Sequence, residues 1–233
     1  MHESETVRKH ADARNQDRVP RSLHGRWSDR GLLLVHLSVT TLPKAADWIS
    51  PDEYLEGERL AEVRHEYVDG RVYAMAGASD DHNRIAGNFF AELRGSLRGH
   101  RCEPFINDMK VKIPPASADA YYYPDVLVAC DPTDNAKYYR ERPTVIIEVL
   151  SPETERTDRR EKAIAYRQIP TAEAYVLVEE ERIAATVLRR TEPGWQSQVI
   201  EGPGSTLSLP GIGVEIPLER IFERTAVARA PVG

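Results

Sequence analysis

The sequence predicts an α/β (α+β) fold, in which a central β-sheet is flanked by helices and further strands follow toward the C-terminus. Two segments, residues 123–130 and 144–150, are almost continuously apolar, which is typical of strands in the middle of a sheet. Residues 79–97 instead repeat apolar side chains at four-residue steps, which indicates an amphipathic helix. Asp69-Gly70 joins two β-rich runs, and this dipeptide favours a tight hairpin.

The N-terminal half of the predicted domain contains three local signals in chain order. Ser50 is placed to cap a short helix that has Pro51 in its first position and Glu53 in its third. The hairpin follows at residues 65–76, and Ser79 opens the long helix. The apolar stripe of this helix is formed by Ile85, Ala86, Phe89, Phe90, Leu93 and Leu97.

The second half alternates strands with one helix. A loop at residues 114–120 precedes the two apolar strands, and a helix at residues 157–168 follows them, with Ala163, Ile164 and Arg167 near one face. The other predicted strands are residues 101–107, 109–113, 173–180, 182–190 and 194–202.

The length and composition are those of an ordinary globular protein, with 233 residues, 41% hydrophobic and 29% charged. We expect one domain at residues 44–225, between a poorly ordered N-terminal extension at residues 1–43 and a C-terminal tail at residues 226–233. The early apolar run GLLLVHLSV is too short to span a membrane. Cys102 and Cys130 form no CxxC pair, which argues against a disulfide framework, so we expect a cytoplasmic protein.

The net charge is −6, which counts against a protein whose main activity is binding phosphate backbones. A cation bound at a cluster of acids would weaken this objection, because it neutralises the charge of its carboxylate ligands.

Asp125 and Glu148 are the only acids within the two apolar strands. An ionised carboxylate in such a strand costs several kcal/mol unless a cation neutralises it. A divalent ion that takes oxygen ligands would do so. Each acid is also compatible with a plain strand end, capped by backbone donors or paired with an arginine.

Six motifs follow one another in the predicted domain: EYVDG, SDDHNRIAGNFFAEL, YPDVLVA, TVIIEVLSPET, REKAIAYRQ and EAYVLVEE. In this order they resemble the Uma-type restriction endonucleases, a bacterial branch of the PD-(D/E)XK nuclease superfamily. The resemblance implies a restriction-endonuclease-like fold with a mixed central sheet. It also implies cleavage of phosphodiester bonds in DNA that depends on Mg²⁺, with Mn²⁺ as an alternative ion.

The resemblance further implies a role for individual residues. Asp125 and Glu148 would be metal ligands, Glu66 would be a third acid, and the backbone carbonyl of Val149 would complete the ligand set. The usual superfamily motif has a lysine two residues after the second acid, where this chain has Leu150.

The resemblance offers Lys162 as the replacement for that lysine. Lys162 would orient the attacking water and stabilise the transition state. It precedes Tyr166 by four residues, so the two side chains share a helix face. The alternative for Lys162 is a solvated position in a charged helical run.

We also consider three contacts to substrate. His82, Lys112 and Tyr166 are candidates. A polar residue in the first turn of a helix, such as His82, is more often a plain surface residue. Lys112 is also compatible with a charged edge strand that it shares with Lys110. The tyrosines at residues 121–123 are compatible with base stacking or with core packing.

Three classes of function remain open on this basis. The leading one is a metal-dependent DNA nuclease, for which we expect a homodimer, because closed two-fold pairing is the commonest oligomer. The second is a hydrolase that uses two carboxylates without metal. The third is a catalytically silent binding module of the same fold.

Overall fold

The computed structural model describes residues 48–114, 119–151 and 154–229. These residues belong to one compact unit that begins at Ala45. The predicted N-terminal extension at residues 1–43 lies outside the described residues. A short helix, α6 (Ala226–Arg229), lies in the first part of the stretch predicted as a C-terminal tail. None of the helices in the described ranges is long and apolar enough to cross a membrane.

The central sheet has six strands in the order β11-β10-β9-β8-β6-β3. β8 and β9 are parallel and the other neighbouring strands are antiparallel, so the predicted mixed sheet is confirmed. Every residue of β8 is buried, as its apolar sequence predicts. The strands are β3 (Glu103–Ile106), β6 (Val126–Ala129), β8 (Pro143–Leu150), β9 (Ala174–Glu179), β10 (Ala184–Thr191) and β11 (Gly194–Glu201).

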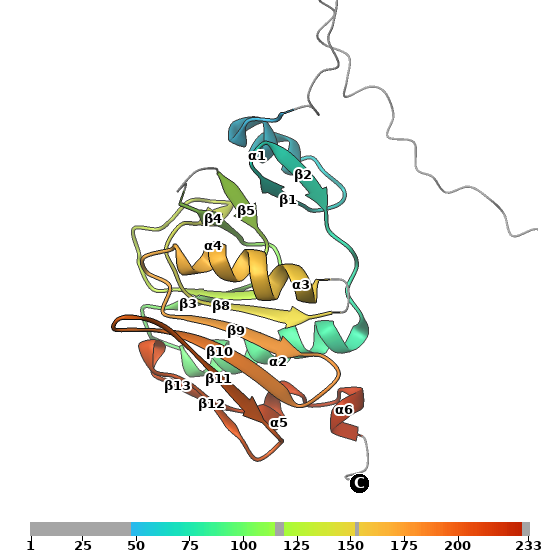
Figure 1. The fold of residues 1–233 in the computed structure, drawn as a ribbon, viewed down its shortest axis with the longest axis vertical. Helices are drawn as coiled ribbons and strands as arrows, with labels where there is room; N and C mark the ends of the chain where they lie inside the picture. Colours follow the sequence, from blue (N-terminus) through green and yellow to red (C-terminus); the bar gives the residue numbers. More distant parts are fainter. Residues whose placement is uncertain (1–47, 115–118, 152–153, 230–233) are drawn as a thin grey trace, which may run out of the picture. The chain divides into compact units, whose positions relative to one another are not determined.

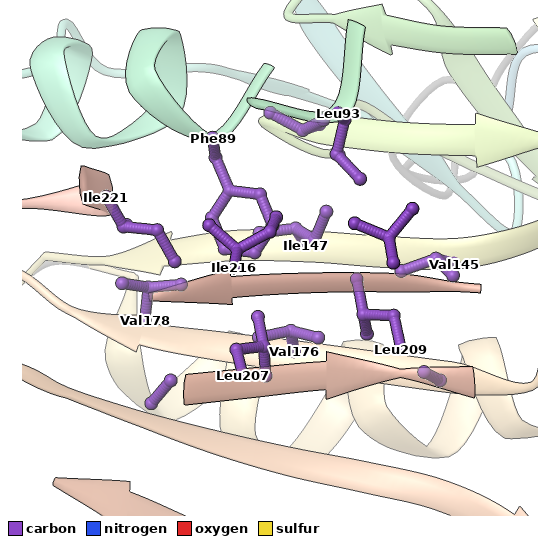
Figure 2. Close-up of a cluster of buried hydrophobic side chains, with 14 of the residues drawn as sticks. Phe89, Leu93, Val145, Ile147, Val176, Val178, Leu207, Leu209, Ile216 and Ile221 are labelled. Atoms are coloured by element: carbon purple, nitrogen blue, oxygen red, sulfur yellow. The ribbon is translucent and has the colours of Figure 1, made fainter. Parts of the chain in front are cut away.

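The long helix α2 (Asp80–Ser96) covers one face of this sheet (Figure 1). The Ser79 side chain caps it by accepting a hydrogen bond from the backbone N–H of His82 at 2.9 Å. Phe89 and Leu93 pack from α2 against β8 (Figure 2). The same core includes residues of β12 (Thr206–Leu209), the 3₁₀ turn η2 (Pro210–Ile212), β13 (Val214–Pro217) and α5 (Leu218–Ile221).

The opposite face of the sheet is covered by the helical segment that connects β8 to β9. It consists of α3 (Glu155–Thr157), the π-helical turn η1 (Asp158–Lys162) and α4 (Ala163–Arg167). The expectation that Ile164 belongs with Ala163 on a packed face is wrong. Ala163 and Tyr166 are buried, whereas Ile164 is 62% exposed.

A second sheet has five strands in the order β2-β1-β5-β4-β7. Its hairpin turns at Asp69 and Gly70, which both have positive φ, and the helix α1 (Pro51–Glu58) has the predicted capping box at Ser50. The two short strands β5 and β7 were not predicted from the sequence. Residues 115–118, which belong to the predicted loop at residues 114–120, lie outside the described residues. The strands are β1 (His65–Val68), β2 (Arg71–Ala74), β4 (Lys110–Ile113), β5 (Ala120–Tyr122) and β7 (Tyr139–Arg140).

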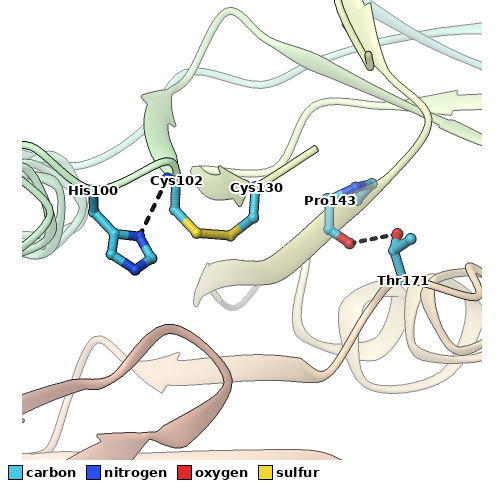
Figure 3. The surroundings of a disulfide bond; sticks show 5 residues. All are labelled: His100, Cys102, Cys130, Pro143 and Thr171. Carbon is cyan, nitrogen blue, oxygen red and sulfur yellow. Dashed lines mark hydrogen bonds between the residues drawn. A yellow bond between two sulfur atoms is a disulfide. The ribbon is translucent and has the colours of Figure 1, made fainter. Parts of the chain in front are cut away.

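A disulfide bond joins Cys102 to Cys130 (Figure 3). The expectation that these two cysteines form no disulfide is therefore wrong. β3 and β6 are antiparallel, and Glu103 lies opposite Ala129. Cys102 directly precedes Glu103 and Cys130 directly follows Ala129, so the same register places the two cysteines opposite each other. The pairing follows from this register and not from the spacing of the cysteines in the sequence.

Candidate functional site

Asp125 and Glu148 lie across from each other at the centre of the six-stranded sheet. β6 and β8 are antiparallel with Val126 opposite Ile147, which places the two acids one step further along the same register. The backbone N–H of Asp125 donates to Glu148 Oε2 at 3.3 Å. The backbone N–H of Val149 donates to Asp125 Oδ2 at 2.7 Å. Both carboxylates are thus held in place by the strand that carries the other.

The Lys162 ammonium lies where three carboxylates meet. Its Nζ is 2.9 Å from Glu66 Oε1, 3.2 Å from Glu148 Oε1 and 3.2 Å from Asp158 Oδ1. The Lys162 side chain is only 7% exposed. The structure therefore brings together Glu66, Glu148 and Lys162, which come from β1, β8 and the π-helical turn.

Glu66 belongs to β1 of the second sheet, and its carboxylate reaches Lys162 from there. Its Oε1 also accepts the backbone N–H of Tyr123 at 3.3 Å. Tyr123 precedes Asp125 by two residues, so one chain segment contacts Glu66 and carries the next acid.

Asp158 is a fourth acid of the site, and its role was not predicted from the sequence. It is 1% exposed, and within the described part of the chain its Oδ1 makes no hydrogen bond, although it is an ion-pair partner of Lys162. Its backbone carbonyl accepts a hydrogen bond from the Tyr175 hydroxyl at 3.1 Å. The only signal in the sequence is the four-residue spacing to Lys162, which is common on solvated helix faces.

π-helical turns are rare and occur often at functional sites. Here the turn contains Asp158 and Lys162 at its two ends, and both side chains are buried. The irregular turn thus places one acid and the only buried lysine of this cluster side by side.

The site has more negative than positive charge. Four acids, Glu66, Asp125, Glu148 and Asp158, accompany one lysine. Burial raises the pKa of Glu148 well above its ordinary value despite the nearby Lys162. Burial also raises the pKa of Asp125, against the lowering effect of His82.

The pKa of Lys162 itself is raised well above its ordinary value. Burial alone would lower it, but the carboxylates of Glu148, Glu66 and Asp158 outweigh that effect. One ammonium cannot compensate four carboxylates in a low-dielectric site, so the cluster favours any additional positive charge.

His82 and Tyr166 also contact the acids. His82 Nε2 lies 3.5 Å from Asp125 Oδ2. The Tyr166 hydroxyl donates to Glu148 Oε1 at 3.0 Å, and Tyr166 is fully buried. Tyr166 therefore contacts Glu148 from within the core, whereas His82 lines the cleft.

Lys112 is not brought to this cluster. Its Nζ pairs with Glu141 Oε1 at 2.8 Å, and it does not line the cleft described below. Leu150, in the position of the usual lysine, is buried in the core together with the tyrosines at residues 121–123. Tyr121 and Tyr122 pack in hydrophobic clusters, as the packing alternative predicts, whereas Tyr123 lines the cleft.

The four acids and Lys162 line a cleft of about 1130 Å³. Among the described residues, no three His, Cys, Asp or Glu side chains are arranged to hold one ion as they stand. The Lys162 ammonium occupies the point between Glu66, Glu148 and Asp158. The donor set nevertheless fits a hard divalent cation, because it consists of carboxylate oxygens with an excess of negative charge.

The chain is similar to proteins of known sequence. The family described as Uma2, putative restriction endonuclease, matches residues 51–219. The uncharacterized protein slr1290 of Synechocystis sp. is 31% identical over 195 residues, which are 83% of this chain and 100% of that protein. The uncharacterized protein sll1609 of the same organism is 34% identical over 131 residues, 55% of this chain and 73% of its own length.

The fold is also similar to that of a solved structure, a putative nuclease of the DUF820 group from Anabaena variabilis. That structure has a TM-score of 0.60 and 17% sequence identity, and the match covers 75% of this chain and 97% of the other. The likeness establishes a shared fold, and the sequence match covers most of the described residues. The chain therefore belongs to the Uma2 family of putative restriction endonucleases.

Proposed function

We propose that this protein is a metal-dependent endonuclease that hydrolyses phosphodiester bonds in DNA. The observation that carries the proposal is that one cleft is lined by Glu66, Asp125, Glu148 and Lys162. Glu66 and Glu148 contact the Lys162 ammonium, and Asp125, just before β6, is hydrogen-bonded to Glu148 and Val149 of β8. Membership of a family described as restriction endonucleases supports the same reaction class. A purely structural ion pair would not require a surplus of buried acids.

Asp125 and Glu148 would hold a Mg²⁺ or Mn²⁺ ion, with the Val149 carbonyl and Glu66 as further ligands. Such an ion, when bound, lowers the pKa of a water ligand and neutralises charge on the phosphate oxygens. The hydrogen bonds from the backbone N–H groups of Asp125 and Val149 keep the two central carboxylates oriented.

Lys162 is the group that we expect to act on the reacting phosphate or the attacking water. Its ammonium provides a positive charge that stabilises a developing oxyanion. It comes from the helical segment after β8 and not from the position of Leu150, yet its Nζ lies 3.2 Å from Glu148 Oε1. This distance supports the idea that Lys162 takes the place of the usual motif lysine, although it comes from a later position in the chain.

The remaining contacts position these groups. The buried hydroxyl of Tyr166 donates to Glu148 Oε1, and Asp158, at the other end of the same π-helical turn, contacts Lys162. His82 is placed beside Asp125 at the cleft wall, where a protonated imidazole would donate to a substrate phosphate.

Supercoiled plasmid DNA provides the direct test. We expect cleavage with Mg²⁺ or Mn²⁺, none with EDTA, and none by Asp125→Asn or Glu148→Gln in either ion. Cleavage that persists in EDTA would support the metal-independent hydrolase. The absence of cleavage with any ion would support the silent binding module. A homodimer with two sites would yield linear as well as nicked plasmid.

A further inference from the structure

A second hollow, of about 510 Å³, adjoins the cleft. Its lining comes from the end of α1, the connection from α1 to β1, β4 and the segment before β7. The two hollows have four lining residues in common: Glu62, Arg64, Asp108 and Tyr123. A ligand as long as a few nucleotides would therefore reach from one hollow into the other.

Lys110 is the unusual residue of this second hollow. It lies on β4 and is only 5% exposed. Its Nζ donates to the Tyr123 hydroxyl at 2.9 Å and lies 4.8 Å from the centre of the Tyr123 ring. In the described ranges no carboxylate oxygen lies within 4.0 Å of this nitrogen. An ammonium has three hydrogens to donate, and the contacts shown here use one of them.

Three acids line the same hollow, Glu58, Glu62 and Asp108, and two of them, Glu58 and Asp108, contact other groups. Glu58 Oε1 accepts hydrogen bonds from the Tyr123 hydroxyl at 3.0 Å and from the backbone N–H of His65 at 2.9 Å. Glu58 Oε2 lies 3.1 Å from His65 Nδ1. Asp108 pairs with Arg64 at 2.5 Å. Lys110 is thus separated from the nearest acid by the Tyr123 hydroxyl.

A buried cation without a direct counter-ion is costly, and the protein can avoid that cost by losing the proton or by gaining an anion. Burial does lower the pKa of Lys110. Because Lys110 lines the hollow, an anion bound there would be a candidate counter-ion for its ammonium. A compact ammonium suits a phosphate oxygen as a point charge.

We propose that Lys110 forms an anion subsite for a phosphate group at the border of the two hollows. The phosphate would be the one that flanks the scissile bond on the same DNA strand. The assignment of this phosphate to DNA rests on the proposed nuclease function. The proposal that the subsite binds a phosphate group does not. A free phosphate ion is the other source of the same ligand chemistry.

Binding of a fluorescently labelled DNA duplex to the full-length protein in EDTA separates recognition from cleavage. Lys110→Met is compared with Lys137→Met, which removes the same charge from an exposed lysine beside Tyr138. We expect Lys110→Met to weaken binding by about tenfold and to reduce the slope of affinity against salt by about one. Lys137→Met is expected to stay within about twofold of wild type.

Tyr123→Phe distinguishes a phosphate contact from a structural role of Lys110. The variant removes the hydroxyl bonded to Lys110 but keeps the ring, the lysine charge and the backbone N–H. We expect near wild-type DNA binding from Tyr123→Phe. If it weakens binding as much as Lys110→Met, Lys110 serves only to hold Tyr123 and the proposal is wrong. Unchanged binding by Lys110→Met also overturns it.

Inorganic phosphate, followed by ³¹P NMR line broadening, tests the subsite without DNA. If the wild-type protein broadens the phosphate signal and Lys110→Met does not, the subsite is supported. If the wild type binds phosphate in this way but does not bind DNA, the subsite proposal stands and the nuclease proposal is contradicted. If wild type binds neither DNA nor phosphate, both fall. Thermal unfolding verifies that each variant folds. If Lys110→Met does not, Lys110→Gln, which retains a donor for Tyr123, replaces it with the same expectations.

Discussion

The Lys162 ammonium lies 3.2 Å from a carboxylate oxygen of Glu148, although Lys162 comes from a π-helical turn and Glu148 from the middle of the central sheet. Two residues that lie 14 positions apart in the chain thus form one buried ion pair. Because Glu66 and Asp158 contact the same ammonium, one lysine offsets the charge of several acids. We expect both the stability and the proposed activity of the protein to depend on this excess of acidic over basic side chains.

Removal of the lysine charge is expected to destabilise the metal-free protein. Lys162→Met leaves three buried carboxylates without their ion-pair partner, which we expect to reduce the free energy of unfolding by about 3 kcal/mol. Urea denaturation followed by circular dichroism in EDTA measures this change. The exposed Lys137→Met is the control and should change stability by less than about 0.5 kcal/mol. A similar small effect of Lys162→Met would mean that the lysine does not neutralise the cluster.

The stability of the metal-free protein should depend on the titration of Glu148. Its folded-state pKa is raised by burial above the ordinary value of 4.5, so the folded protein binds this proton more tightly than the unfolded chain does. The stabilisation from this proton is complete below pH 4.5 and is lost as pH rises through the raised pKa.

Glu148→Gln isolates this contribution, because glutamine stays neutral. Over the pH range above 4.5 we expect the wild type to lose stability progressively relative to Glu148→Gln. Addition of Mg²⁺ should restore more stability to the wild type at the upper end of this range than at the lower end. Parallel pH profiles of the two proteins, with or without Mg²⁺, would contradict the raised pKa.

Asp158→Asn tests whether the fourth acid positions Lys162. The substitution preserves the size of the side chain and removes one of the three charges around the ammonium. We expect kcat for DNA cleavage to decrease by about tenfold with little change in KM, because a misplaced lysine affects the transition state more than binding.

A second measurement separates this role from a general loss of structure. If Asp158 only stabilises the fold, Asp158→Asn should lower the melting temperature without a selective loss of kcat. If it positions Lys162, kcat should decrease while the melting temperature in EDTA remains the same or increases, because the surplus of buried negative charge is smaller.

The disulfide between Cys102 and Cys130 gives a prediction that does not involve the site. It closes a loop with a sequence separation of 28 residues, and its reduction is expected to cost about 3 to 4 kcal/mol of stability by loop-closure entropy. Protein prepared without reductant should show no reactive thiol after denaturation, and a lower melting temperature in dithiothreitol. Two reactive thiols under both conditions would contradict the pairing.

Local signals were sufficient to predict most of the helices and strands. Ser50 and Ser79 begin α1 and α2 as expected, because a side-chain cap is encoded within a few residues. The hairpin at Asp69-Gly70 is encoded equally locally. The strand β5, with three residues, depends instead on β1 and β4 for its hydrogen bonds, so its own sequence carries too little information.

The site was predictable where burial and charge conflict within one segment. Asp125 and Glu148 stand out because each is the only acid in an apolar strand. Asp158 does not stand out, because its segment is rich in charge and its burial depends on a π-helical turn that no sequence pattern indicates. The burial of Lys110 was not predictable either, because the alternation of charged and apolar residues in its strand is equally typical of an exposed edge strand.

The rate at which the wild-type protein converts supercoiled plasmid in Mg²⁺, relative to the rate of Glu148→Gln at the same pH, tests the proposed nuclease site most directly. The proposal predicts metal-dependent cleavage by the wild type and a decrease of at least about 100-fold in the variant, because a metal ligand is lost. Equal rates for the two proteins, or no cleavage by the wild type with either Mg²⁺ or Mn²⁺, would contradict it.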